Sequence, residues 1–273
     1  YGPEFFFIPN RFWTIRKDDE DMIEICNEST RQTISIPKQY FVKAMRKPEL
    51  YMNEISPKLA HYVLCLPPHD MRSLPTDVRT YIRWGELQGI KAITAARDKD
   101  FWFSFVYRQL QKKRLYGRVA FVRKFRITTS GVLAHYFKDK VTGAKGFYLL
   151  TTSDKDLDML LGAWFNSTPF IAEYLWTRRV IQGAWSELMI EDLKRIPCLD
   201  IRQLDAETVK TIEKAFLELI QLKLPPIPCQ IGKDYRRKLD KAVLSALGFR
   251  DNDEFLEKLY EAVSRLLLVS RES

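Results

Sequence analysis

The chain has 273 residues, of which 46% are hydrophobic and 13% aromatic, and its formal net charge is +9. This composition excludes an intrinsically disordered chain and supplies enough apolar side chains for one large domain or two. No run of about eighteen apolar residues occurs, which excludes a membrane-spanning helix. The four scattered cysteines match neither a disulfide framework nor a zinc ribbon.

The first third of the chain has a mixed α and β pattern. Short strand-like runs at 12–16 and 22–26 are joined by an acidic turn, and a third apolar run lies at 60–66. Pro37 is predicted to open a short helix that runs to about Arg46. A longer helix is predicted to begin near Thr76 and to end at Gly89.

The middle of the chain alternates at the period of a strand. Aromatic residues occupy every second position from Phe101 to Tyr107, which predicts a strand. Residues 118–127 predict another strand, with one apolar face and one largely basic face, and 133–137 and 147–151 continue the sheet. Phe121 and Phe125 share the apolar face, so we expect them to pack in the core and not to stack on bases.

Helices are predicted for the rest of the chain. Asp156 can cap a helix that carries the apolar positions 157–164, and a second helix follows Pro169. The last quarter is predicted to hold three amphipathic helices, the first capped by Asp205. These patterns indicate an α+β fold, in which residues 1–204 form a mixed or antiparallel sheet domain and residues 205–273 form a helical region.

The positive charge is concentrated in one segment. Residues 101–138 hold nine basic residues and no acidic one, whereas the rest of the chain has equal numbers of each. Like charges crowded together repel each other unless a polyanion neutralises them, so this segment predicts binding to nucleic acid through displaced counterions. Acidic neighbours supplied by the fold are the alternative.

No catalytic or metal motif is present. Phosphate-binding glycine loops, the G-x-S-x-G elbow and H-E-x-x-H are absent. Asp154, Asp156 and Asp158 have the spacing of a calcium loop but lack its glycine and terminal glutamate, so we expect acids near a helix N-terminus. We therefore predict no catalytic residue, no metal and no cofactor within this chain.

Three sequence patches occur in an order that resembles the motif order of a known protein family. The first consists of residues 147–150 and the run LLGAWFNS at 160–167. The second consists of RRVIQGA at 178–184, Leu188 and DLKRIP at 192–197. The third spans Arg237 to Gly248. This order resembles the target-recognition region of adenine-specific DNA methyltransferases of restriction–modification type, over about residues 81–267. It departs from that family at Gln182-Gly183, where two glycines are usual.

The resemblance implies a recognition half without its catalytic half. Such enzymes place an S-adenosylmethionine-binding half, with an Asn-Pro-Pro-aromatic signature, before the recognition half. Here Leu66-Pro67-Pro68-His69 lacks both the amide and the aromatic residue. Because the sequence begins at Tyr1, we expect an upstream catalytic domain that binds S-adenosylmethionine, duplex DNA as the ligand, no membrane partner and a cytoplasmic location. The alternatives are a stand-alone specificity subunit that recruits a separate methyltransferase, and an RNA-binding accessory domain.

The residues predicted to contact DNA are basic or carry a side-chain amide. Arginine suits guanine, glutamine suits adenine, and lysine suits phosphate. The predicted set is Arg108, Gln109, Lys112, Lys113, Arg114, Arg118, Arg123, Lys124, Arg126, Lys138, Arg178, Arg179 and Gln182.

Overall fold

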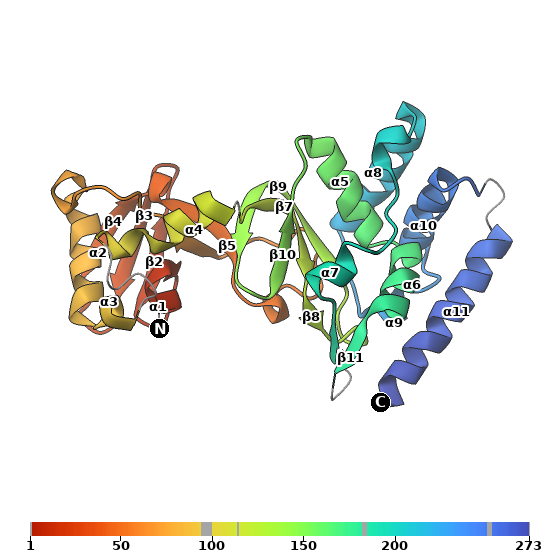
Figure 1. The fold of residues 1–273 in the computed structure, drawn as a ribbon, viewed down its shortest axis with the longest axis horizontal. Coiled ribbons are helices and arrows are strands. Elements are labelled where there is room, and N and C mark those ends of the chain that lie inside the picture. Colours follow the sequence, from red (N-terminus) through yellow and green to blue (C-terminus); the bar gives the residue numbers. More distant parts are fainter. Residues whose placement is uncertain (1, 94–99, 114, 182–184, 250–252, 273) are drawn as a thin grey trace. The chain divides into compact units, whose positions relative to one another are not determined.

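The computed structural model describes residues 2–93, 100–113, 115–181, 185–249 and 253–272 (Figure 1). It divides into two compact units, which we call unit 1 (Tyr1–Met45 and Leu59–Tyr116) and unit 2 (Arg46–Lys58 and Gly117–Ser273). Both units combine helices with antiparallel strands, so the predicted α+β class is confirmed. The boundary predicted at residue 204 lies inside unit 2. Among the described residues, no helix combines the length and apolar character of a membrane span.

Unit 1 contains two groups of antiparallel strands. Strands β2, β3 and β4 form a meander, and β1 and β5 both pair with β6. The helices of this unit are α1 to α4, and α2 packs on β4. Their bounds are α1 Gly2–Phe6, β1 Phe7–Ile8, β2 Trp13–Asp18, β3 Met22–Asn27, β4 Thr33–Pro37, β5 Phe41–Met45, β6 His61–Leu64, α2 Thr76–Leu87, α3 Ile90–Ile93 and α4 Phe105–Lys113.

An aromatic cluster forms the core of unit 1. The ring of Tyr81 lies 4.9 Å from that of Phe5 and 5.4 Å from that of Trp13, and all three side chains are fully buried. The Tyr81 hydroxyl donates to the backbone oxygen of Phe5 at 2.7 Å, which satisfies its one buried polar atom. Aromatic packing therefore ties the N-terminal segment to α2.

Two predictions in unit 1 are wrong. The helix expected from Pro37 to Arg46 is strand β5, preceded by a short 3-10 turn, because its apolar residues pair with β6. The strand expected at Phe101–Tyr107 is a 3-10 turn at Trp102–Ser104 followed by α4. Trp102 and Phe103 are both buried although they are adjacent, so the aromatic alternation did not mark two faces. The arginine, glutamine and lysine residues that follow favour a helix.

Unit 2 is built on strands β7, β9 and β10. Central strand β7 pairs antiparallel with both β9 and β10, and a smaller sheet has the order β11-β12-β8. The strands are β7 Gly117–Val122, β8 Lys124–Phe125, β9 Ala134–Gly143, β10 Phe147–Leu150, β11 Arg179–Ile181 and β12 Trp185–Glu187. These bounds confirm the strands predicted around 133–137 and 147–151, whereas the single strand predicted for 118–127 is divided into β7 and β8, which belong to different sheets.

The basic face predicted for residues 118–127 is wrong for β7 itself. Ala120 and Val122 are buried, as are Val119 and Phe121 on the other face. Since β7 is a central strand covered on both faces, exposed charge is confined to the residues beyond its end. The core position predicted for Phe121 and Phe125 is confirmed, because both are at most 3% exposed.

Helices complete unit 2. Helix α5 packs on β7 and β9, α8 packs on α5, and α10 packs on α8 and α6, while α11 packs on α6 (Figure 1). The caps agree with the sequence except that Asp154, and not Asp156, caps α5. Asp205 caps α8, as predicted, and Ser167 caps α6. The bounds are α5 Lys155–Phe165, α6 Thr168–Thr177, α7 Ile190–Leu193, α8 Ala206–Ile220, α9 Ile227–Gln230, α10 Asp234–Ala246 and α11 Asp253–Glu272.

A buried polar network joins these helices to the sheet. Arg236, only 1% exposed, donates to the backbone oxygen of Asn166 at 2.7 Å and to Oε1 of Gln230. The Asn166 amide donates to the backbone oxygen of Ala134 at 2.8 Å. Asp240 is fully buried and accepts from Thr168, whose backbone nitrogen lies 2.7 Å away. Because a buried charge needs several partners, these residues stabilise one arrangement of α6, α10 and β9.

Candidate nucleic-acid interface

The predicted contact residues are divided between the two units. Helix α4 of unit 1 carries Arg108, Gln109, Lys112 and Lys113, whereas most of the other predicted residues belong to unit 2. Arg114 and Gln182 lie outside the described residues, and Arg179 is described only as the first residue of β11. The acid-free segment therefore does not form one continuous surface within a single unit.

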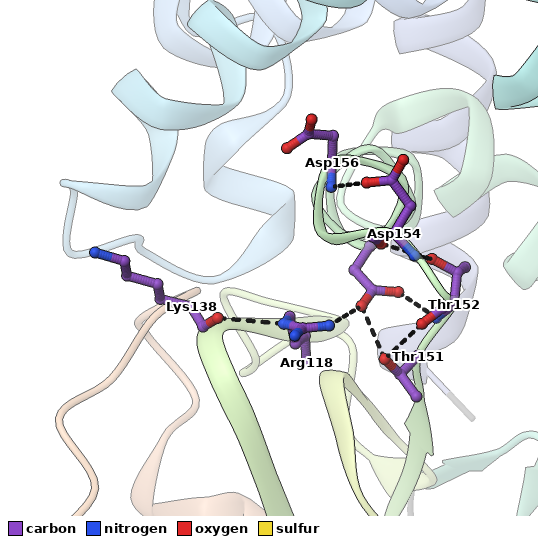
Figure 2. A network of polar contacts seen from close by, with 7 residues as sticks. Arg118, Lys138, Thr151, Thr152, Asp154 and Asp156 are labelled. Carbon is purple, nitrogen blue, oxygen red and sulfur yellow. Dashed lines mark hydrogen bonds and ion pairs between the residues drawn. The ribbon is translucent and has the colours of Figure 1, made fainter.

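Arg118 is held in an internal polar network (Figure 2). Its Nη1 lies 2.9 Å from Oδ2 of Asp158, and the two side chains are 11% and 0% exposed. Its Nε donates to the backbone oxygen of Lys138 at 3.2 Å. Asp158 also accepts from Oγ1 of Thr151 and from the backbone nitrogen of Thr152. This arginine therefore fastens the start of α5 to the sheet, and we leave it out of the proposed contact surface.

Three other predicted arginines also have partners within the protein. Arg123 pairs with Glu187 at 2.9 Å. Arg178 donates to the Ser186 hydroxyl at 3.0 Å, and its partial burial lowers the pKa of its guanidinium. Arg108 donates to the backbone oxygen of Phe101 at 3.1 Å. The acidic neighbours that the fold could supply are thus present for Arg118 and Arg123.

Lys124 and Arg126 differ from these arginines. Both side chains are exposed, and neither forms an ion pair with an acidic residue in the part of the chain that the structure describes. Lys112, Lys113 and Lys138 are likewise exposed. Of these exposed cations, Lys124 and Arg126 line a cavity.

The strand register places these two cations on one face. Strand β8 pairs with β12, so that Lys124 lies opposite Glu187 and Phe125 lies opposite Ser186. Phe125 points inward and stacks on Tyr174 with ring centroids 5.4 Å apart. Since successive side chains of a strand alternate, Lys124 projects from the opposite side of β8, and Arg126, the residue after this strand, lies over the same Trp185 ring as Lys124.

Trp185 lies beside both cations. The Lys124 Nζ is 5.5 Å and the Arg126 Cζ is 5.4 Å from the centroid of the Trp185 ring, within the range of cation–π attraction. This side chain is partly exposed at the start of β12. Two cations and one indole therefore form a basic, aromatic surface, which we call the Trp185 face.

A cavity of about 210 Å³ opens beside the Trp185 face. Its walls are mostly apolar and include Met52, Val122 and Val132, and the turn at Thr129 and Ser130 also lines it. The backbone nitrogen of Ser130 donates to the oxygen of Arg126 at 3.0 Å, and that of Gly131 donates to the oxygen of Met52 at 2.8 Å. Backbone hydrogen bonds therefore hold the cavity wall to the segment at 46–58.

His135 forms a buried polar part of the cavity wall. Its side chain is fully buried, and Nδ1 lies 2.9 Å from the backbone oxygen of Glu54. A carbonyl oxygen only accepts, so Nδ1 carries the proton and Nε2 has a free lone pair. Burial lowers the pKa of His135 to about 4, which keeps the ring neutral at pH 7. The buried Nε2 has no hydrogen-bond partner among the described atoms.

Sequence reasoning identified the two cations but not their surroundings. Trp185 lies beyond the motif-like run that ends at Ala184, and His135 was one of three scattered histidines. The place of Trp185 in the sequence, directly after the glycine-containing run at 182–184, was a local signal for it. The described residues contain no group of three or more histidine, cysteine or acidic side chains that could hold a metal ion.

Comparison with known proteins gives a likeness of fold. No family model matches the chain, and no curated protein matches it. A solved structure, the type IIG restriction endonuclease BpuSI, superposes with a TM-score of 0.60 at 13% sequence identity. The match covers 86% of this chain and 27% of BpuSI, so the chain spans about a quarter of the length of that enzyme. At this identity, the likeness concerns the fold alone.

Proposed function

We propose that this chain recognises duplex DNA on behalf of an adenine-specific, S-adenosylmethionine-dependent DNA methyltransferase of restriction–modification type. The observation that carries the proposal is the Trp185 face, where Lys124 and Arg126 are exposed without an acidic partner among the described residues. A pair of cations of this kind favours a polyanionic ligand.

Three further observations support this proposal. The excess positive charge of the chain arises from residues 101–138, which include both cations. The fold is similar to part of BpuSI, whose name, a type IIG restriction endonuclease, describes cleavage in a restriction system. The sequence patches that resemble methyltransferase recognition regions lie largely in the same unit as the Trp185 face.

The two cations suit different parts of a duplex. The compact ammonium of Lys124 suits a phosphate oxygen, whereas the planar guanidinium of Arg126 can bind either a phosphate or the edge of guanine with two hydrogen bonds. Lys112, Lys113 and Lys138 would add phosphate contacts. We assign Arg118, Arg123 and Arg178 to the scaffold.

Methyl transfer is assigned to a catalytic half that lies outside this sequence. That half would bind S-adenosylmethionine and the target adenine, and the chain described here would supply position and sequence preference. The proposal therefore expects no methyl transfer by this chain alone.

A salt titration of DNA binding tests this proposal. We expect the affinity for a mixed-sequence duplex to fall linearly with salt on logarithmic axes. The double variant Lys124→Gln/Arg126→Gln should bind more weakly, and it should reduce the slope by about 0.9 for each of the two side chains that contacts a phosphate.

A matched control is available on α11. The double variant Lys258→Gln/Arg265→Gln also removes one lysine and one arginine, but these residues are exposed and already pair with Glu254 and Glu261. It should leave the slope nearly unchanged. Equal effects of the two double variants would refute the assignment to the Trp185 face, and no binding at low salt would refute the proposed function.

A further inference from the structure

An acidic residue, Glu187, lies next to the Trp185 face. Strand β12 is the middle strand of the small sheet, so Glu187 is in register with Lys124 of β8 on one side and with Arg179 of β11 on the other. Its carboxylate oxygen Oε1 nevertheless lies 2.9 Å from Nε of Arg123, the residue between β7 and β8. The acid that lies opposite Lys124 is therefore bound to the residue that precedes this lysine.

Lys124 has the geometry of an alternative partner for this carboxylate. Residues directly opposite each other on antiparallel strands have Cβ atoms about 4.5–5.5 Å apart and point to the same face, and opposite charges at such positions attract each other. In the structure, the Lys124 Nζ lies instead 5.5 Å from the centroid of the Trp185 ring, which is two residues before Glu187 on β12. Because the lysine side chain is flexible, its position depends on which cation Glu187 binds.

The backbone and partial burial both favour Arg123 as the partner of Glu187. The Arg123 backbone nitrogen donates to the oxygen of Gly146 at 2.9 Å, and its backbone oxygen accepts from the nitrogen of Leu188 at 3.2 Å. The Arg123 and Glu187 side chains are 36% and 22% exposed, so water and salt screen this ion pair less than one at the open surface. A guanidinium is also more weakly hydrated than an ammonium, which favours Arg123 over Lys124 at this partly buried position.

We propose that Arg123 is a positioning residue of the Trp185 face, which keeps the Glu187 carboxylate away from Lys124 and so leaves this ammonium free to bind a DNA phosphate. This inference rests on the proposed function, because the phosphate belongs to the duplex. Glu187 is then an internal competitor of that phosphate. Without Arg123, the carboxylate would pair with Lys124, and one phosphate contact would be lost although the lysine itself is intact.

Removal of the Arg123 charge tests this role. We expect Arg123→Gln to bind a mixed-sequence duplex about fivefold more weakly at low salt and to reduce the salt slope by about 0.9, the value for one phosphate contact. Arg123→Lys keeps a cation beside Glu187 and should retain most of the affinity. Arg265→Gln is the matched control, because it also removes one arginine and leaves one exposed carboxylate, that of Glu261, without its partner. The control should leave affinity and slope nearly unchanged.

A second substitution separates positioning from direct contact. In Arg123→Gln/Glu187→Gln the competing carboxylate is absent, so Lys124 is free again, and both affinity and slope should return to the wild-type values. If Arg123 itself touched a phosphate, this double variant would stay weak. In a Lys124→Gln background, Arg123→Gln should have no further effect, because the ammonium that Arg123 protects is already absent.

A measurement without DNA tests the same contact in the free protein. Acetic anhydride acylates the neutral amine of a lysine, and an ion pair with a carboxylate lowers the neutral fraction. Peptide mass spectrometry should therefore find Lys124 acylated about threefold more slowly in Arg123→Gln than in the wild-type chain. The wild-type rate should return in Arg123→Gln/Glu187→Gln. Lys138, which is also exposed, is the reference within the same chain and should react equally in all three proteins.

The outcomes separate the two proposals. If the wild-type chain binds the duplex with the expected slope and Arg123→Gln binds equally well, the positioning role is wrong and the proposed function stands. A double variant Arg123→Gln/Glu187→Gln that stays weak, or an unchanged acylation rate of Lys124 in Arg123→Gln, also overturns the inference. If no duplex binds at low salt, the proposed function fails and the role of Arg123 in DNA binding fails with it, whatever the acylation of Lys124 shows.

Discussion

Lowering the pH is expected to destabilise unit 2 by an amount that His135 determines. The unfolded chain protonates this histidine near its ordinary pKa of 6.5, whereas burial lowers the folded pKa to about 4. The folded state therefore binds fewer protons between these values, and stability present above pH 6.5 is lost as the pH falls towards 4. At about 1.36 kcal/mol per pKa unit, the loss is about 1.4 kcal/mol at pH 5.5 and about 2.5 kcal/mol at pH 4.5.

Urea titrations of the whole chain at pH 7.5, 5.5 and 4.5 measure this loss. Pulsed hydrogen–deuterium exchange of peptides from β7 and β9 identifies the transition of unit 2. Carboxylates also contribute to acid sensitivity, so the comparison is with His135→Asn, which cannot acquire the imidazolium charge. The wild-type free energy of unfolding should fall more steeply than that of the variant, by the amounts given above.

The control is His69→Asn, which changes an exposed histidine in unit 1. It should leave the pH dependence of unit 2 unchanged. Parallel curves for the wild-type chain and His135→Asn between pH 7.5 and 4.5 would refute the reasoning, because they would mean that His135 titrates alike in the folded and unfolded states.

Three further predictions concern the scaffold of unit 2, and urea unfolding checks each of them. Arg118→Met should lower the free energy of unfolding by about 3–5 kcal/mol because it leaves the buried Asp158 without its cation. A double variant that also replaces Asp158 with Leu should lose less free energy of unfolding than the sum of the losses of the two single variants. Asp240→Ala should cost about 3 kcal/mol or more because three buried donors lose their acceptor, and an effect below about 1 kcal/mol would contradict the proposed network. Gly117→Ala should destabilise because its Cβ would lie 2.5 Å from the backbone oxygen of Leu150, whereas Gly143→Ala meets its nearest neighbour at 3.4 Å and should be tolerated.

The sequence predicted elements well where local signals determine them. The helix that follows Asp205 was placed by its capping residue and apolar periodicity, and the structure confirms both. Helix α10 ends at Ala246, two residues before Gly248, and this glycine adopts a φ of +92°, as is common just after a helix. These features depend on residues within one or two turns of each other, so the sequence alone is sufficient.

Prediction failed where distant partners decide the structure. The segment after Pro37 forms a strand because β6 is available to pair with it. Likewise, the segment after Phe101 has aromatic residues at alternate positions, but the adjacent Trp102 and Phe103 are buried together. Neither the pairing partner nor the packing neighbours can be read from a short window of sequence.

At the candidate site too, distant partners decide the outcome, because they determine which cations remain exposed and unpaired with an acid. A count along the chain found nine cations without an acid, yet Asp158 pairs with Arg118 from forty positions away and Glu187 pairs with Arg123 from sixty-four positions away. Linear charge density predicts where a polyanion could bind, but only the fold decides which cations remain available. Lys124 is one of the cations that remain available.

The residues that carry the family resemblance are used mainly to hold the scaffold together. Asn166 joins α5 to β9, Asp240 joins α10 to α6, and Arg237 pairs with acidic residues of α11. If such motifs preserve scaffold contacts of this kind, then the motifs indicate the fold and carry little information about the DNA site. Sequence preference would then reside in positions that the motifs leave open, such as Arg126 and Trp185 on the Trp185 face. Exchanging these positions should therefore alter DNA binding while the free energy of unfolding changes little.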